Sequence, residues 1–287
     1  MTSVGAILSP YPNPPESFRA AVRAAEDAGL EALWVWEDCF RSSAFAVASA
    51  ALAWTERLRI GIGITPMPLR NVAATAMEIA TIERIFPGRL MPGVGHGVLS
   101  WMAQTGARVA SPLTLMREYV PALRGLLAGE ELSVGGRYVT LDRVRLDWPP
   151  AAPPRVYAAA EGPKTLALAG QVADGTVLDM RHTVDEVATA VQAVRTSGGA
   201  QHHIVAYVVA AFGPDAAARA VGFYGDDAPA DAGDRVLAGS VDEVAAGVQR
   251  YAAAGVDHVV LMPPNDTRLP EYYAAAAEVG RLIGTAA

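Results

Sequence analysis

Short runs of apolar or alternating residues recur along this chain, and most are followed by a longer stretch with the spacing of an amphipathic helix. Alternating strand and helix patterns are typical of α/β folds, in which helices cover a parallel sheet. The pattern predicts eight strands, at 4–9, 32–37, 59–65, 89–95, 155–160, 175–179, 203–212 and 258–264.

The helices between these strands are predicted by apolar positions that recur every three or four residues and by glycines at their ends. A doubly wound open sheet would also alternate, but eight regular units favour closure into a (β/α)8 TIM barrel. We expect one domain over residues 1–287. The helices are expected at 15–30, 43–54, 72–86, 112–129, 184–196 and 270–284, with others after 161 and before 258.

Two segments depart from this alternation. Residues 131–150 contain a Gly-Gly pair between alternating residues, which predicts a small β-hairpin inserted between units four and five. Segment 213–240 has the weakest pattern, and within it GFYGDDAPADAGDR indicates an acidic surface loop or lid.

The composition excludes some classes of protein. The hydrophobic content of 52% is sufficient for a core, and the formal charge of −7 argues against general binding to nucleic acid or to anionic membranes. No run of about 18 apolar residues predicts a membrane span. Because the N-terminus lacks signal-peptide features and the chain has a single cysteine, we expect a cytoplasmic protein without an intrachain disulfide.

In a barrel of this type the active site lies where the strands end, and this rule selects candidate residues before any motif does. The strand ends carry Asp38 and Cys39, then Thr65, then His96 and Gly97, then Glu161, Gly162 and Lys164. They show neither metal-ligand spacing nor a GxSxG nucleophile motif, so no metal site is predicted.

Lys164 is the only lysine of the chain, and it lies at the predicted start of a helix. A cation is unfavourable there because it faces the positive end of the helix dipole. A bound anion would remove this penalty, since free amides and an ammonium group would then surround it. The alternative is a solvated surface lysine beside an ordinary Gly-Pro turn.

Several linked stretches resemble the bacterial luciferase-like superfamily, in particular its branch that uses coenzyme F420, a deazaflavin. They run in order through IGIGITPMPLRN, IATIERIFPGRLMPGVGHG, PLTLMREYVPALRGLLAGE and VYAAAEGPKTLALAGQVADG. The resemblance implies a luciferase-like TIM barrel and an F420-dependent oxidoreductase. It would transfer a hydride between the cofactor and a small organic substrate.

The resemblance also implies roles for individual residues. Asp38 matches an aspartate near the deazaflavin ring, and Thr65 matches a contact after the third strand, where Gly63–Ile64 is the expected cis peptide bond. The pair His96–Gly97 matches a set of backbone contacts. The phosphate end of the cofactor is expected at Glu161, Gly162 and Lys164.

Two positions differ from the F420-dependent sugar and alcohol dehydrogenases of this family. Cys39 replaces a histidine and Val98 replaces a glutamate, so both members of that acid–base pair are missing. His96 is the first candidate for proton delivery and Cys39 the second. The alternatives are a positioning role for His96 and a small buried hydrophobe at Cys39.

Other functions and an assembly state remain as hypotheses. The same resemblance admits an FMN-dependent monooxygenase, which would need a reductase partner, or a flavin-binding protein without catalytic activity. We expect a homodimer through helices of the second and third units. Trp34 and Trp36 alternate along one strand and indicate core packing, whereas Trp101, in an expected loop, indicates a pocket wall.

Overall fold

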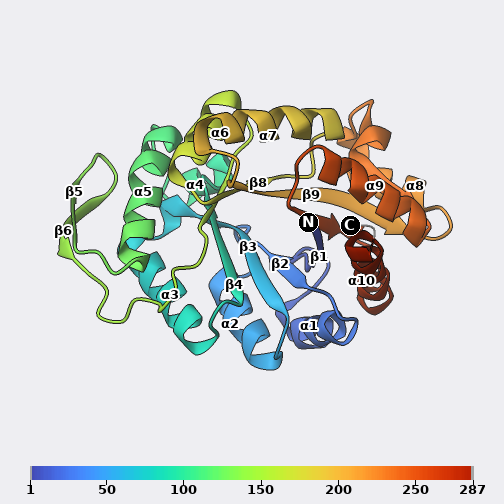
Figure 1. Ribbon diagram of the computed structural model, residues 1–287, viewed down its shortest axis with the longest axis horizontal. Helices are drawn as coiled ribbons and strands as arrows, with labels where there is room; N and C mark the ends of the chain where they lie inside the picture. The colour runs from blue at the N-terminus through green and yellow to red at the C-terminus, as the bar shows by residue number, and fades with distance from the viewer. Residues whose placement is uncertain (1, 286–287) are drawn as a thin grey trace.

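Eight parallel strands form a closed ring in the computed structural model, which describes residues 2–285 (Figure 1). Neighbouring strands follow the order β9-β11-β1-β2-β3-β4-β7-β8, and a further pairing of β8 with β9 closes the ring. The predicted (β/α)8 barrel is therefore confirmed, and the open doubly wound sheet is wrong. The ring strands are β1 (Ser3–Ile7), β2 (Ala32–Val35), β3 (Arg59–Pro66), β4 (Leu90–Gly95), β7 (Tyr157–Ala159), β8 (Gly175–Leu178), β9 (His203–Phe212) and β11 (His258–Met262).

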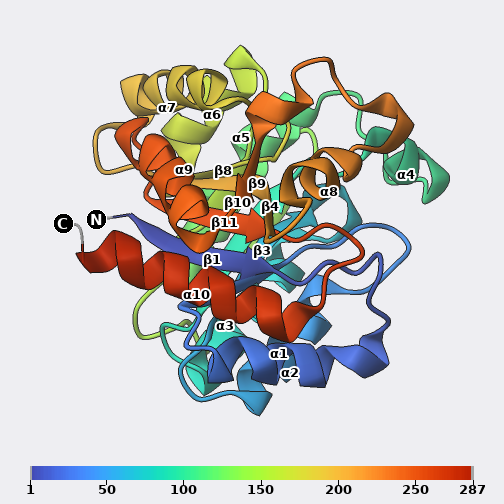
Figure 2. The ribbon, with the colours of Figure 1, turned by 90° about the vertical axis from the view of Figure 1, so that its right-hand side faces the viewer.

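Helices surround the ring, and α10 packs against β1 and α1, beside the first strand (Figure 2). Side-chain oxygens cap the starts of five helices, and Thr183 and Ser240 each form a reciprocal capping box. None of the described helices is long and apolar enough to cross a membrane. The helices are α1 (Phe18–Asp27), α2 (Ala44–Trp54), α3 (Val72–Ile85), α4 (Leu99–Gln104), α5 (Pro112–Leu127), α6 (Pro163–Val172), α7 (Val184–Gly198), α8 (Ala216–Gly222), α9 (Val241–Ala253) and α10 (Leu269–Thr285).

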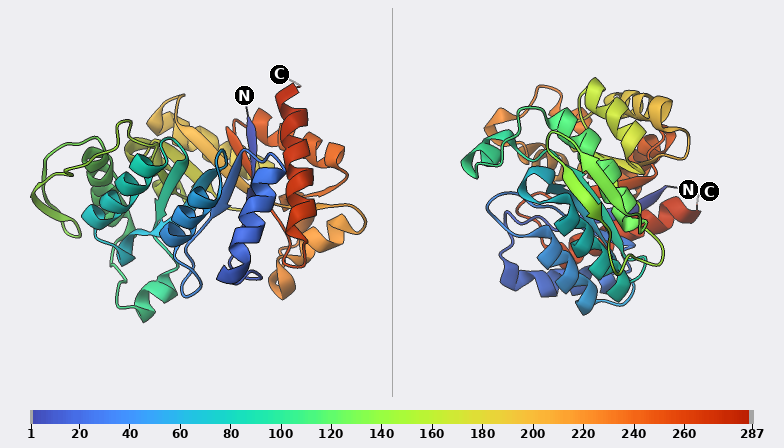
Figure 3. Two further views of the ribbon diagram at one scale, coloured as in Figure 1. Left: turned by 90° about the horizontal axis from the view of Figure 1, so that it is seen from below. Right: turned by 90° about the vertical axis from the view of Figure 1, so that its left-hand side faces the viewer.

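The predicted hairpin insertion is confirmed. Strands β5 (Leu132–Gly135) and β6 (Thr140–Val144) pair antiparallel and project from the barrel beyond α5 (Figure 3). Glu118 of α5 accepts hydrogen bonds from the backbone N–H groups of the hairpin turn, at 2.8 to 3.1 Å. This carboxylate therefore fixes the insertion to the helix that precedes it.

The segment with the weakest pattern, 213–240, is more regular than the sequence indicates. Its first part forms α8, and its last part forms β10 (Val236–Gly239), which pairs in parallel with the end of β9. Between them, 223–235 contains only two short 3-10 turns, in agreement with the expected loop. Because β10 has four residues and α8 has seven, neither is long enough to show a clear period.

A cluster of aromatic side chains fills the ring. Trp34 is fully buried, and its ring meets Tyr157 and Tyr207 edge-to-face with centroids 5.9 Å apart in both pairs. The indole Nε1 donates to His258 Nε2 at 3.0 Å, so Nδ1 carries the proton of this histidine and donates to Ser3 Oγ at 2.6 Å. The core packing predicted for Trp34 is confirmed.

The buried imidazole predicts how stability depends on pH. Burial, together with the nearby His203 and Arg59, lowers the pKa of His258 to about 3. The unfolded chain binds a proton here below about pH 6.5, whereas the folded protein does not, so stability falls as the pH decreases through that value. At pH 5 this residue alone should cost about 2 kcal/mol of unfolding free energy.

Urea unfolding at pH 7 and pH 5 measures this effect. The variant His258→Gln keeps an acceptor for the Trp34 indole but does not titrate, so it should lose less stability between the two pH values than the wild type. Equal losses in the two proteins would contradict the assignment.

Candidate active site

A cavity of about 800 Å³ opens at the C-terminal ends of the barrel strands. Residues that follow six different strands line it, as expected for an active site of this fold. Seven of the predicted site residues are on its wall: Asp38, Gly63, Ile64, His96, Gly97, Glu161 and Gly162. Cys39, Thr65 and Lys164 are not among the lining residues, and their roles stay predictions.

Asp38 is held by two donors on the cavity wall. The Tyr11 hydroxyl and the Trp36 indole N–H both donate to Asp38 Oδ2 at 2.8 Å. Burial raises the pKa of this carboxyl, although both hydrogen bonds oppose the shift. Tyr11 directly follows the first strand, so the strand-end rule selects it, but the sequence predicts no role for it. Trp36 is predicted only as a core residue.

The Thr65 side chain does not line the cavity, because its hydroxyl is hydrogen-bonded to the largely buried ion pair of Glu37 and Arg70. Glu37 accepts from both terminal nitrogens of Arg70 and, at 3.4 Å, from Thr65 Oγ1. A second oxygen of Glu37 accepts from the backbone N–H of Ala44, the first residue of α2. This ion pair joins the loop after β2 to the end of β3, and nothing in the sequence indicated that these groups would meet.

The floor of the cavity contains an irregularity in β3. The pairing of β3 with β4 shifts register between Ile62 and Thr65, and the Gly63–Ile64 peptide bond is cis, as predicted. A Cβ at Gly63 would lie 1.8 Å from the Tyr207 hydroxyl, which donates to the Gly63 carbonyl at 3.3 Å. Glycine is therefore required here by lack of space. The Cys39–Phe40 bond is also cis, which was not predicted.

The two candidates for proton delivery lie in different surroundings. Burial lowers the pKa of His96, which favours the neutral imidazole, and its Nδ1 is buried without a hydrogen-bond partner among the described residues. Burial and the carboxylates of Glu37 and Asp38 raise the pKa of Cys39, which favours the thiol over the thiolate. The geometry therefore favours His96 for contact with a ligand.

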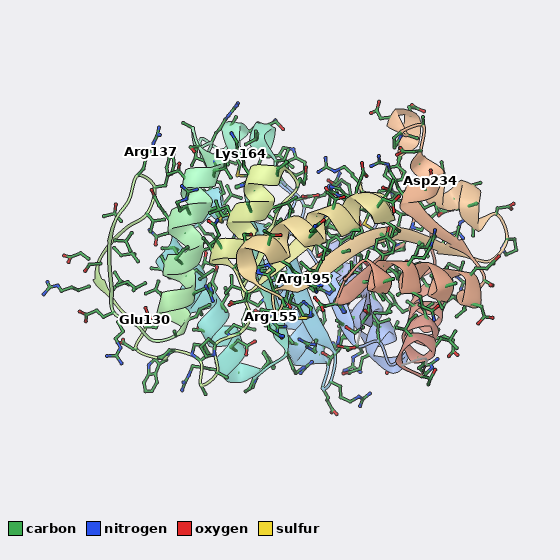
Figure 4. The ribbon with its side chains drawn as sticks, turned by 45° about the horizontal axis from the view of Figure 1, so that its top comes forward. Glu130, Arg137, Arg155, Lys164, Arg195 and Asp234 are labelled. Carbon is green, nitrogen blue, oxygen red and sulfur yellow. The ribbon has the colours of Figure 1, made fainter. Side chains whose placement is uncertain are left out.

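At the other end of the cavity, α6 begins without a side-chain cap. Gly162 is its N-cap residue, and the space where a side chain would project from Gly162 is open. Lys164 is exposed at the start of this helix and forms no ion pair among residues 2–285 (Figure 4). Pro163 has no N–H, and the N–H groups of Thr165 and Leu166 donate to the Gly162 carbonyl at 2.9 Å, so in this first turn the Lys164 amide is the donor that can face solvent or a ligand. Together with the Lys164 ammonium group it is suited to an anion.

The prediction that Trp101 forms a pocket wall is wrong. This residue lies in the short helix α4 rather than in a loop, and it is not among the cavity residues. Val98 and Leu99 line the cavity instead and are 44% and 45% exposed. Because positions two apart lie on opposite sides of a helix, Leu99 and Trp101 cannot share the same wall.

A family model described as luciferase-like monooxygenase matches residues 1–224 of the chain. The 5,10-methylenetetrahydromethanopterin reductase of Methanolobus tindarius is 29% identical over 163 residues, 57% of this chain and 50% of that protein. The F420-dependent hydroxymycolic acid dehydrogenase of Mycobacterium tuberculosis is 30% identical over 194 residues, 63% of this chain and 54% of that protein. The matched part thus spans about half the length of these curated relatives.

Solved structures of known proteins share the fold over nearly the whole chain. An F420-dependent secondary alcohol dehydrogenase, in complex with an F420–acetone adduct, has a TM-score of 0.85 at 20% identity and covers 99% of both chains. The monooxygenase RslO1 from Streptomyces bottropensis has a TM-score of 0.80 at 19% identity and covers 100% of both chains. At these identities the likeness is one of fold.

Proposed function

Because the chain belongs to the luciferase-like monooxygenase family, we propose that it is an oxidoreductase that transfers a hydride between coenzyme F420 and a small organic substrate. The names of the curated relatives support this, since they include an F420-dependent dehydrogenase. The observation that carries the proposal is the cavity itself. It joins Asp38, Gly63 and His96 at one end to the uncapped start of α6 at the other.

The described residues fit such a cofactor. The buried Nδ1 of His96 lacks a partner, and a polar edge of a bound ring would supply one. Gly63 allows close approach to the strand, and the amide and ammonium groups of Lys164 at the start of α6 suit a phosphate. Binding to the ring is assigned to Asp38, Gly63, Ile64, His96 and Gly97, and to the backbone of Thr65, whose hydroxyl is bonded to Glu37 and Arg70. Binding to the phosphate end is assigned to the backbone of Glu161 and Gly162 and to Lys164.

When bound, the deazaflavin supplies the hydride chemistry, and the protein supplies position and proton transfer. His96 would carry the proton because it is the histidine on the cavity wall and is held neutral by burial. Cys39 is the second candidate. Since Cys39 and Val98 replace the acid–base pair of the sugar and alcohol dehydrogenases, we do not assign a sugar phosphate as substrate.

Two other functions remain alternatives because a monooxygenase also shares the fold, with a TM-score of 0.80 against 0.85 for the F420-dependent alcohol dehydrogenase. An FMN-dependent monooxygenase would require a reductase partner and access for oxygen. A flavin- or deazaflavin-binding protein without catalytic activity would explain the missing acid–base pair.

For the protein itself, we propose a cytoplasmic location.

We also propose that the protein is a homodimer through α2 and α3. Met77 and Ile85 of α3 are each 61% exposed. The exposed positions of α2 are alanines, at 46 and 53. The other exposed positions of α3 are Ala74, Thr81 and Arg84, so Arg84 is the one charged residue among the exposed positions of these two helices. Such mainly uncharged outer positions are suited to contact with a second copy.

Titration with each cofactor tests the proposed function. Quenching of intrinsic fluorescence should show F420 binding at least about tenfold more tightly than FMN, because the matched relatives are named for F420. Tighter binding of FMN by a similar factor would favour the monooxygenase. Absence of binding to either would refute the proposal.

Substitution of His96 tests the proton donor. On a substrate found by screening with reduced F420, His96→Ala should lower turnover by at least about 10²-fold, with the cofactor dissociation constant nearly unchanged. Cys39→Ala should have a much smaller effect. Full turnover in His96→Ala, with loss in Cys39→Ala, would reverse the two roles.

Light scattering tests the dimer. The wild type should have twice the mass of the 30.0 kDa chain, and Met77→Glu should be monomeric because it buries a charge at the contact. Gln192→Glu is the matched control, since it adds a charge at an exposed position of α7. A monomeric wild type at micromolar concentration would contradict the proposal.

A further inference from the structure

One arginine on the cavity wall is shared between two carboxylates. Arg181 Nη2 contacts both Glu161 and Asp179, and Arg181 Nε donates to Asp179 Oδ2 at 2.6 Å. The side chains of Arg181 and Glu161 are more than half exposed, whereas that of Asp179 is 26% exposed. An exposed carboxylate, Glu161, and a more buried one, Asp179, therefore share the same guanidinium.

This ion pair lies beside the predicted phosphate site. Glu161, Gly162, Thr165, Asp179 and Arg181 all line the cavity, and Gly162 is the uncapped start of α6. A carboxylate at this place is negatively charged, as is a phosphate that would bind at the start of the helix. The Glu161 side chain thus occupies a donor that an incoming anion would use.

The neighbouring groups make Glu161 the weaker ion-pair partner of Arg181 and Asp179 the stronger one. Burial and the negative charge of Asp179 raise the pKa of Glu161, although Arg181 and His182 oppose the shift. Hydrogen bonds from His182 and Arg181 hold the pKa of Asp179 far below its usual range, despite burial. When the number of negative charges at this site increases, Glu161 is the group that can accept a proton.

Resting on the proposed function, we propose that the Glu161 side chain is a built-in competitor for the anionic end of the cofactor. When the phosphate binds at the start of α6, Arg181 transfers hydrogen bonds from Glu161 to the phosphate. The pKa of the Glu161 carboxyl, left without its cation beside a second negative charge, then rises, and the carboxylate takes up a proton from solvent in a fraction of the molecules that depends on the pH. Cofactor binding is thereby coupled to proton uptake.

Other charged groups face the same site and also change with pH. His182 contacts Asp179 at 3.1 Å, and this contact raises the pKa of the imidazole, so acid adds a positive charge there too. Lys164 is on α6 and Glu186 is on α7, where it interacts with His182. The number of protons that Glu161 itself takes up is therefore obtained by comparing the wild type with a variant at Glu161.

Calorimetric titration of the protein with F420 tests the inference. Measurements in two buffers of different ionisation enthalpy, between pH 6 and pH 8, give the number of protons taken up. The wild type should take up a fraction of a proton, and its affinity should fall as the pH rises through the pKa of Glu161 in the complex.

The variant Glu161→Gln should take up fewer protons and should bind F420 about fivefold or more tightly at pH 8, where the wild-type carboxylate is charged. The affinities of the two proteins should converge at low pH, where Glu161 of the wild type is protonated and therefore uncharged, as the glutamine is. Glu131→Gln is the control, because it makes the same change of net charge at an exposed position before the hairpin. It should bind as the wild type does.

A deazaflavin that lacks the phosphate tests whether the phosphate is the group that competes with the Glu161 carboxylate. It should show no difference between the wild type and Glu161→Gln. An equal difference with this compound, equal proton uptake in the wild type and Glu161→Gln, or weaker binding of F420 to Glu161→Gln would overturn the inference while F420 binding itself stands. If F420 does not bind at all, the proposed function fails and the competitor role fails with it.

Discussion

The hydrogen bond between Trp34 and His258 lies at the centre of the ring, and the geometry of the cavity depends on it. It fixes the large indole in the barrel, where a Cβ at Gly61 would lie 2.1 Å from the ring. Tyr207 packs edge-to-face on the indole, and its hydroxyl reaches the carbonyl of Gly63 at the cavity floor. Packing in the barrel thus determines the shape of the surface on which a ligand would lie.

The two ends of the cavity carry different polar groups. At one end, burial lowers the pKa of His96, which favours the neutral imidazole, and raises the pKa of the Asp38 carboxyl, which is held by two neutral donors. At the opposite end, Arg181 and Glu161 form an exposed ion pair near the start of α6. Such a distribution suits a long ligand with a flat, weakly polar ring at one end and an anion at the other.

The sequence predicts the barrel well because strand and helix periods are local properties, and it predicts much of the site because strand ends meet at one rim. It fails where the outcome depends on contacts between distant residues. Glu37 and Arg70 are 33 positions apart, and their ion pair determines where the Thr65 side chain points. Glu161 and Arg181 are likewise 20 positions apart, so neither charge pattern nor spacing indicated their contact.

A crystal structure of the protein grown with F420 tests the central claim, that this cavity is a deazaflavin site, most directly. We expect the ring against the Gly63–Ile64 segment, beside Asp38 and His96. The phosphate should lie within hydrogen-bond distance of the Lys164 amide or ammonium group at the start of α6. A ring bound outside the cavity, or a phosphate held at another part of the barrel, would contradict the claim.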